Sequence, residues 1–449
     1  MKIRQDTSVP SSRAARKTIL SAAIGNFAEW YDFAIYGVVA TIIAKQFFPA
    51  GDSTTALISA YVVFGLTYVS RPLGGLIAGW LGDTFGRRRA LSFTIVLMCS
   101  GTALIGFLPS YAEIGIFAPL LLTACRLVQG LGTGGEYSSA ISFVYEHSDP
   151  RTRPIRISYL VTTTFLGITS SVLVASLCSG ILGEEAFDAW GWRILFWFAA
   201  PLGLVGLYLR SKVAETPDFE EVVAARKETR VKATPIRSTF RTQASAMLLF
   251  FCIVSAYALI TPILSSYFIT FIQRDGGLSS GQSYNVALAI NLVMIATTLA
   301  GGRIMFRYGL QRTFVIGGLF IAVVSVPAFY LSTLGVAGAL VGGSLLSVGK
   351  GVVAVAAAMA MSYMFPARVR VTAGAFAYNI CTIVFGAAGP SLGIWFSEIT
   401  GSNMTFSIYL GVVGLLSAVA AIVGRARLRT AAGDLSGNED ATNYAYLHR

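Results

Sequence analysis

The feature that most constrains this chain is a series of apolar segments, each of which is long enough to cross a lipid bilayer. A spanning helix needs about 20 predominantly apolar residues. Hydrophobic residues make up 55% of the chain and charged residues only 12%, whereas about 25% of the residues in soluble domains are charged. The sequence therefore predicts an all-α membrane protein with twelve transmembrane helices. The predicted spans are residues 18–44, 55–81, 91–110, 116–146, 157–182, 192–210, 244–272, 283–305, 313–333, 338–365, 371–398 and 404–424.

A densely charged stretch at residues 211–243 divides these spans into two blocks of six. We interpret the stretch as a solvated, amphipathic linker helix, which is the usual structure of such a charge run. The predicted divisions are an N-terminal tail (1–17), a first six-helix bundle (18–210), the linker (211–243), a second six-helix bundle (244–424) and a C-terminal tail (425–449).

The net charge of +12 is explained by topology and does not indicate nucleic-acid binding. With the N-terminus inside, 28 of the 34 lysines and arginines fall in the tails and in loops on one side. Lys45 and Arg274 lie in loops of the opposite side, and Arg193 lies at a helix mouth. Cytoplasmic loops carry an excess of lysine and arginine, so we expect both termini in the cytoplasm and the bilayer as the main partner.

The cysteines and histidines argue against a metal site, a cofactor or an enzyme. All five cysteines lie inside apolar stretches without a CxxC pair, and they are interpreted as packing residues. The two histidines are His147 in a loop and His448 in the tail. A membrane-embedded enzyme would need a catalytic group in the bundle, and the sequence offers no histidine there. We expect no enzyme activity, no cofactor and no metal.

The informative residues are the charges inside the predicted spans. A charge at mid-bilayer costs about 2.5–3.5 kcal/mol on insertion scales, and it persists where it faces a partner or a wet cavity. Two interpretations stay open for the acids: a transport site, or a buried network that holds helices together. For Arg71, which precedes Pro72, a structural or gating role is favoured. The charged residues are Glu29, Asp32, Arg71, Arg126, Glu136 and Lys350.

Two of the basic residues in this set are Lys350 and Arg126, which lies in the fourth predicted span. The segment from Ser347 to Val352 is otherwise apolar and has no acid on its own helix. Arg126, Gln129, Thr133 and Tyr137 recur at helical spacing, so they share one polar face. We interpret that face as the lining of a cavity. The alternative for Lys350 is that it snorkels or pairs with a buried acid.

A loop motif recurs at the same place in each block. Residues 79–89 read GWLGDTFGRRR and residues 302–312 read GRIMFRYGLQR, with glycines matched and a basic residue at the end of each. The first copy resembles the signature of the major facilitator superfamily. The stretches 25–33, 126–137 and 190–193 narrow the resemblance to its metabolite:proton symporter family, whose members carry citrate, 2-oxoglutarate, shikimate or proline/betaine. The resemblance covers residues 18 to about 424.

This resemblance implies a two-bundle fold that works by alternating access in the bacterial inner membrane, as a monomer. Parallel repeats around a midplane site are a known transporter plan, and the repeat aligns Arg126 with Lys350. Two facing cations suit a solute with two anionic ends. We therefore expect proton-coupled symport of a small organic anion, such as a di- or tricarboxylate.

Two alternatives stay open. A betaine or proline importer would hold its cation with aromatic rings, for which Trp30, Tyr31, Tyr257 and Tyr267 are available. A drug or antimetabolite exporter of the same fold would use the same charges for antiport.

The functional residues that these expectations select form three sets. The substrate-binding candidates are Arg126, Lys350, Gln129, Tyr137, Tyr31 and Asn379. The candidates for proton coupling are Asp32, Glu136 and Glu29. The gating candidates are Asp83, Arg87, Arg88 and Arg71.

The position of Asp83 at the cytoplasmic membrane edge predicts a role in gating rather than in binding. We expect Asp83→Asn to lower the transport rate of reconstituted protein while its equilibrium affinity for the solute changes little. A large loss of affinity with normal turnover would show that Asp83 belongs to the binding site.

Overall fold

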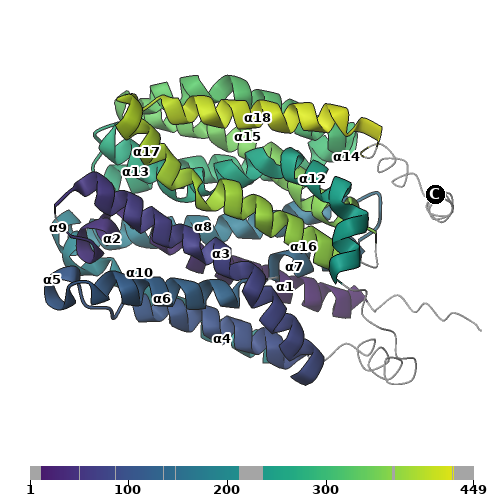
Figure 1. Cartoon of the computed structure of the whole chain (residues 1–449), viewed down its shortest axis with the longest axis horizontal. Helices are drawn as coiled ribbons and strands as arrows, with labels where there is room; N and C mark the ends of the chain where they lie inside the picture. The colour runs from purple at the N-terminus through teal and green to yellow at the C-terminus, as the bar shows by residue number, and fades with distance from the viewer. Residues whose placement is uncertain are drawn as a thin grey trace, which may run out of the picture.

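The structure is a computed structural model that describes residues 12–49, 51–85, 87–134, 136–146, 148–211, 236–366, 370–426 and 428 (Figure 1). Its described residues are almost entirely helical. The helices of the first half are α1 (Ser12–Val38), α2 (Ala40–Phe47), α3 (Ser53–Phe85), α4 (Arg87–Ile105), α5 (Tyr111–Ile114), α6 (Phe117–Gly132), α7 (Glu136–Glu146), α8 (Arg153–Leu182), α9 (Glu184–Ala186), η1 (Phe187–Gly191) and α10 (Arg193–Ser211). Most of the predicted linker lies outside the described residues.

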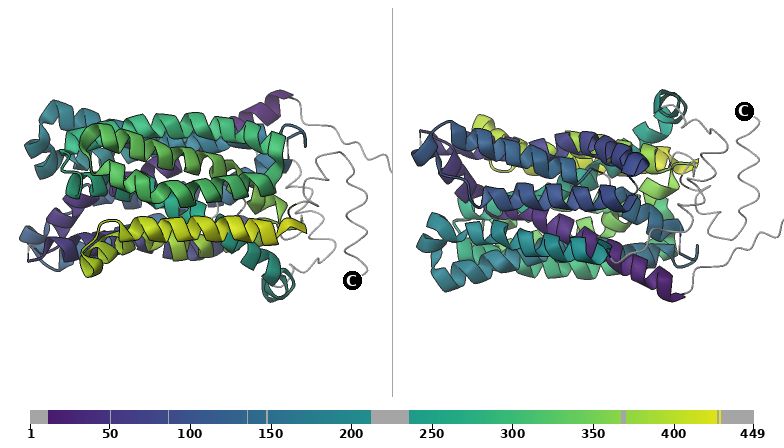
Figure 2. Two further views of the ribbon diagram at one scale, coloured as in Figure 1. Left: turned by 90° about the horizontal axis from the view of Figure 1, so that it is seen from above. Right: turned by 90° about the horizontal axis from the view of Figure 1, so that it is seen from below.

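The second half begins with α12, which starts at the same end of the bundle as α1 (Figure 1). Its helices are α12 (Ile236–Pro262), η2 (Ile263–Tyr267), α13 (Phe268–Arg274), α14 (Ser280–Ser332), α15 (Gly335–Tyr363), α16 (Arg370–Cys381), η3 (Thr382–Ala387), α17 (Gly389–Thr400) and α18 (Thr405–Val423). Figure 2 shows that the long helices of both halves run roughly parallel to one axis, with the start of α1 and the end of α18 at the same end.

The prediction of a twelve-helix membrane fold is confirmed, although several spans are broken. Among the described residues, seven helices are long and apolar enough to cross a bilayer, and two bent helix pairs raise this to nine. The 53-residue α14 contains two crossings, because the chain turns back at Gly309, whose φ of +78° favours glycine. The shorter apolar α4 and the broken pair α6–α7 provide the remaining crossings.

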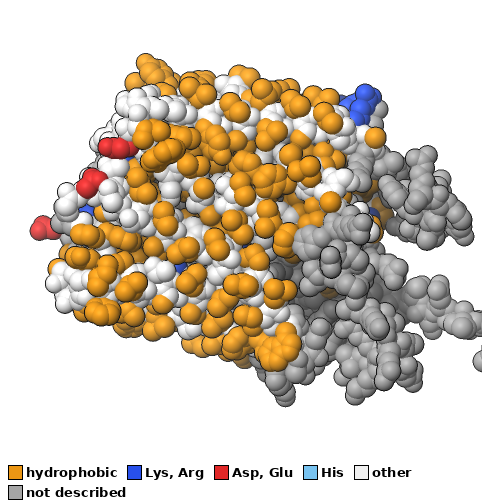
Figure 3. Space-filling model, viewed as in Figure 1, with side chains coloured by type: hydrophobic (Ala, Val, Ile, Leu, Met, Phe, Trp, Pro, Cys, Tyr) orange, Lys and Arg blue, Asp and Glu red, His pale blue; other side chains and the backbone are white. Residues whose placement is uncertain are grey.

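The outer surface of the bundle is apolar, as a lipid-facing surface requires. Large hydrophobic side chains point outward from helices of both halves: Leu73, Ile181, Val323 and Val423 are each more than half exposed. Figure 3 shows hydrophobic side chains spread over the side of the bundle, with the acidic groups at one end. This distribution matches a protein whose sides contact acyl chains.

The two halves are joined by hydrogen bonds at the end of the bundle opposite to the termini. Tyr61 of α3 and Thr270 of α13 share a hydrogen bond of 2.6 Å. Farther around the rim, Ser176 of α8 donates to Asn285 of α14 at 2.9 Å. The N–H of Gly281 also donates to Glu184 at 2.9 Å. This end is therefore closed by direct contacts between the halves.

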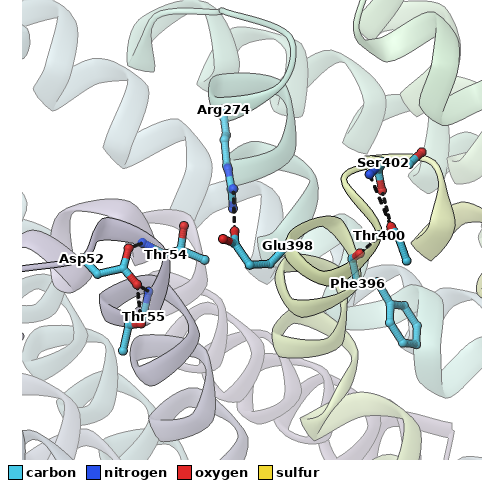
Figure 4. A network of polar contacts seen from close by, with 8 residues as sticks. All are labelled: Asp52, Thr54, Thr55, Arg274, Phe396, Glu398, Thr400 and Ser402. Atoms are coloured by element: carbon cyan, nitrogen blue, oxygen red, sulfur yellow. Dashed lines mark hydrogen bonds and ion pairs between the residues drawn. The ribbon is translucent and has the colours of Figure 1, made fainter.

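Two polar networks organise the loops at the same end (Figure 4). Asp52 caps the start of α3 by accepting the N–H groups of Thr54 (3.0 Å) and Thr55 (3.1 Å) and the hydroxyl of Thr55. These bonds hold the pKa of the Asp52 carboxyl below its usual range, and the bond from the Thr55 hydroxyl contributes most. Arg274, which ends α13, forms an ion pair with Glu398 of α17 at 3.7 Å.

Close backbone contact between α3 and α6 explains why the predicted continuous span 116–146 is broken. A Cβ on Gly74 would meet the carbonyl of Leu131, and one on Gly134 would meet the backbones of Arg71 and Gly75. Glycine lets two helices approach to this distance. The chain leaves the helix after Gly132 and starts α7 at Glu136.

This contact generates a matched pair of glycine substitutions. Gly74→Ala places a methyl group against a backbone carbonyl that cannot rotate away, so we expect it to lower the free energy of unfolding by about 1–3 kcal/mol. Gly180 of α8 has open space at its Cβ position, so Gly180→Ala should leave stability unchanged or raise it by up to about 1 kcal/mol. Thermal melting in detergent micelles measures both; equal melting temperatures would contradict the packing argument.

Candidate functional site

Asp32 is held inside the first half by a glutamine. Gln129 of α6 donates its amide to the Asp32 carboxylate at 2.7 Å, to the Asp32 backbone carbonyl at 3.1 Å and to the hydroxyl of Thr102 of α4 at 2.7 Å. All three side chains are buried. The second carboxylate oxygen of Asp32 accepts no hydrogen bond from a described residue. One oxygen of the Asp32 carboxylate is thus hydrogen-bonded to a neutral amide.

Arg126 belongs to the same network and is connected to Asp32 through Gln129. Its guanidinium donates to the side-chain oxygen of Gln129 and, at 3.3 Å, to the carbonyl of Phe64. The guanidinium also lies over the ring of Tyr36 at 4.4 Å and that of Phe64 at 5.2 Å. Gln129 therefore bridges Asp32 and Arg126, and the aromatic faces cover the remaining surface of the cation.

A small cavity lies where α1, α3, α6 and α7 of the first half meet α16 of the second. It is narrow and partly open to solvent. Glu29 and Arg71 bring the two charges to its wall, and both are buried. Arg71 also lies over the rings of Phe33 at 4.9 Å and Tyr68 at 5.0 Å. The lining residues are Glu29, Arg71, Thr133, Tyr137, Ser138, Ala375, Tyr378 and Asn379.

Aromatic side chains from both halves meet beside this cavity. The rings of Tyr137 and Tyr378 lie 5.7 Å apart across the contact between the halves. Trp30 packs edge-on against Tyr137 at 5.9 Å. The hydroxyl of Tyr257, from α12, lies near those of Tyr137 and Tyr378. Four aromatic residues from both halves thus form one contiguous group beside the cavity.

Lys350 lies apart from these groups, on the second half. Its side chain is fully buried, and its ammonium group makes no hydrogen bond with a described residue. The ammonium lies 4.7 Å from the centre of the Phe165 ring. Phe165 belongs to α8 of the first half, so Lys350 points at the contact between the halves.

The structure brings some of the predicted site residues together and separates others. Asn379 and Tyr137 line the cavity with Glu29. Tyr31 instead donates its hydroxyl to the carbonyl of Leu195 on α10 at 3.3 Å. Glu136 begins α7 and is partly buried. The side chains of Asp83, Arg87 and Arg88 lie outside the described residues.

Of the four aromatic residues available for a cation, two meet at the cavity. Trp30 and Tyr257 join the aromatic group there. Tyr267 packs within the second half against Phe271 and Phe406, and Tyr31 faces α10.

Sequence reasoning missed Thr102 and Tyr378. Thr102 also donates to the carbonyl of Met98 at 3.2 Å, as helical threonines commonly do, so nothing in its own segment marks it. It reaches Gln129 because Gly101 lets α4 approach the backbone of Gln129 closely. Tyr378 stands one residue before the predicted Asn379, and its meeting with Tyr137 depends on contact between the halves.

Comparison with known proteins shows a consistent group of relatives. The sequence profile of the Major Facilitator Superfamily matches residues 22–390. The proline/betaine transporter of Salmonella typhimurium is 34% identical over 424 residues, which are 93% of this chain and 85% of that protein. The glycine betaine/proline/ectoine/pipecolic acid transporter OusA of Dickeya dadantii is 34% identical, over 92% of this chain and 84% of that protein.

A solved structure shows the same fold. The D-xylose-proton symporter superposes with a TM-score of 0.71 at 16% identity, covering 91% of this chain and 96% of that one.

The bridge made by Gln129 predicts a specific loss of stability. Gln129→Leu removes the donor to Asp32 and the acceptor for Arg126, so we expect the free energy of unfolding to fall by about 1–3 kcal/mol. Thr102→Val removes one acceptor but leaves the bridge in place, and it should cost about 1 kcal/mol or less. Thermal melting in detergent measures both, and equal losses would show that Gln129 does not bridge the two charges.

Proposed function

Because the chain belongs to the Major Facilitator Superfamily, we propose that it imports a small zwitterionic solute of the proline or betaine kind together with protons. The observation that carries this proposal is the composition of the cavity between the halves. One acid, Glu29, and one base, Arg71, line it beside two tyrosine rings. Opposite charges in equal number suit a solute without net charge, and aromatic faces attract a substituted ammonium group.

The relatives support the same class of solute. The protein of Salmonella typhimurium is a proline/betaine transporter, and that of Dickeya dadantii carries glycine betaine, proline, ectoine and pipecolic acid in its name. A di- or tricarboxylate, which we expected first, has less support. It would need several free cations, whereas Arg126 is engaged by Gln129 and covered by Tyr36.

Asp32 is the leading candidate for the group that carries the coupling proton, with Glu136 and Glu29 as the other candidates. A buried carboxylate must be neutralised by a base or by a proton at each stage of the cycle. One oxygen of the Asp32 carboxylate accepts the neutral amide of Gln129, and the other accepts no hydrogen bond from a described residue. A proton from outside would fill that vacant position, and its release inside would restore the empty carrier.

We further propose the placement of the protein in its membrane. The positive charge of the predicted tails and of the linker at 211–243 supports an orientation with both termini in the cytoplasm of a bacterial cell. In this orientation Asp83, Arg87 and Arg88 lie at the cytoplasmic edge and, with Arg71, form the gate. The protein acts as a monomer, because each chain provides both walls of the cavity.

Uptake into proteoliposomes tests the function. An inward pH gradient of about two units stores about 2.7 kcal/mol per proton, enough to sustain about 100-fold accumulation of a solute carried with one proton. We expect labelled glycine betaine or proline to accumulate, and a protonophore to abolish this accumulation. Citrate, 2-oxoglutarate and shikimate serve as comparison solutes. Accumulation of these acids without betaine or proline would overturn the proposed solute class.

The same vesicles test the proton carrier. Asp32→Asn and Glu136→Gln should each leave solute exchange intact, because binding does not require the proton. At least one of them should lose accumulation driven by the gradient. If both single variants and the double variant still accumulate solute, neither acid carries the proton, and Glu29 is the next residue to test.

A further inference from the structure

Lys350 is a buried cation for which the described protein supplies no polar partner. Its side chain has 0% exposure, and its ammonium group donates no hydrogen bond to a described residue. The Phe165 ring at 4.7 Å is its recorded contact. Burial of an ammonium ion is strongly unfavourable, and a single cation–π contact offsets only part of that penalty. The position is therefore incompletely compensated.

The location of Lys350 connects it to the transport route. It lies on α15 in the second half, and the ring that covers it lies on α8 in the first half. Helix α15 packs against α7 as well as α8, and α7 carries Tyr137 of the cavity wall. A group that binds Lys350 would thus enter between the halves, where a moving solute must pass.

A further polar side chain close to Lys350 also has unused hydrogen-bonding capacity. Ser347 lies one turn before Lys350 on the same face of α15, and its buried hydroxyl has no partner among the described residues.

Two such groups one helical turn apart indicate a missing polar partner. Nine in ten or more buried polar groups in proteins have a hydrogen-bond partner. An ammonium and a hydroxyl together can donate several bonds to one small acceptor. A carboxylate has the charge that Lys350 requires and two oxygens to accept these bonds.

Lys350 suits the carboxylate better than Arg71 does. Arg71 shares its cavity wall with the acid Glu29 and lies over the rings of Phe33 and Tyr68. No acidic residue lies on α15 with Lys350.

We propose that Lys350, with Ser347, is the subsite that binds the carboxylate of the transported solute. This inference rests on the proposed function, in which the solute is a zwitterion. Phe165 covers the ammonium while the subsite is empty and gives way when the carboxylate arrives. The ammonium end of the solute then points to the aromatic group of Trp30, Tyr137, Tyr257 and Tyr378. One solute thereby contacts both halves.

Two probes that differ in one end test the subsite. Glycine betaine and choline share a trimethylammonium group, but choline has a hydroxyl in place of the carboxylate. Binding of each is measured by calorimetry on purified full-length protein. Lys350→Met keeps the length of the side chain and removes its charge. We expect this variant to bind betaine about 10- to 100-fold more weakly, as loss of a charge-assisted hydrogen bond implies, and to bind choline with unchanged affinity.

Further variants separate a binding role from a structural one. Lys350→Arg keeps the charge and should retain most of the preference for betaine over choline. Ser347→Ala should weaken betaine binding by a smaller factor, of about 3 to 10. Lys45→Met is the matched control, because Lys45 is an exposed lysine paired with Asp188 at 3.3 Å, and it should change neither affinity.

The outcomes distinguish the two proposals. If the wild-type protein binds neither betaine nor proline, the proposed function fails and the subsite with it. If the wild type binds betaine but Lys350→Met keeps its preference for betaine over choline, the subsite alone is overturned. An equal loss of both probes, with or without a fall in melting temperature, also overturns it, because Lys350 would then support the structure rather than the carboxylate.

Discussion

The cost of a charge in a low-dielectric interior governs the arrangement of this protein. Every charged side chain in the bundle must be compensated by an opposite charge, by hydrogen bonds, by aromatic faces or by a bound solute. The structure uses a different solution for each. Gln129 connects Asp32 with Arg126, aromatic rings cover Arg71, and Lys350 has one ring. A buried charge that is well compensated stabilises the fold, and one that is poorly compensated is a candidate for binding a ligand.

The sequence was sufficient for the fold because the lipid imposes a strong pattern on it. Twenty-residue apolar segments, divided by one charged stretch, predicted twelve helices in two halves, and the fold confirms them. The same physics identified the charges inside the spans, including Glu29 and Lys350. Patterns within one helix, however, fix only the face on which a side chain lies, and not what it touches.

The details of the site depend on packing between helices that are distant in the sequence. Gln129 was expected to bind solute, but the approach of α4 at Gly101 places it between Thr102 and Asp32. The break between α6 and α7 could not be foreseen either, because it follows from backbone contact with α3. The pairing of Tyr137 with Tyr378 requires the two halves to meet. No local pattern carries that information.

The contacts that close the end opposite to the termini have a consequence for the speed of the cycle. Most of these bonds join neutral groups, such as Tyr61 with Thr270 and Ser176 with Asn285. When the halves separate, water replaces each bond, whose net contribution is about 0.5–1.5 kcal/mol. Neither of these two bonds is an ion pair that has to be separated. Such a seal can open within thermal reach.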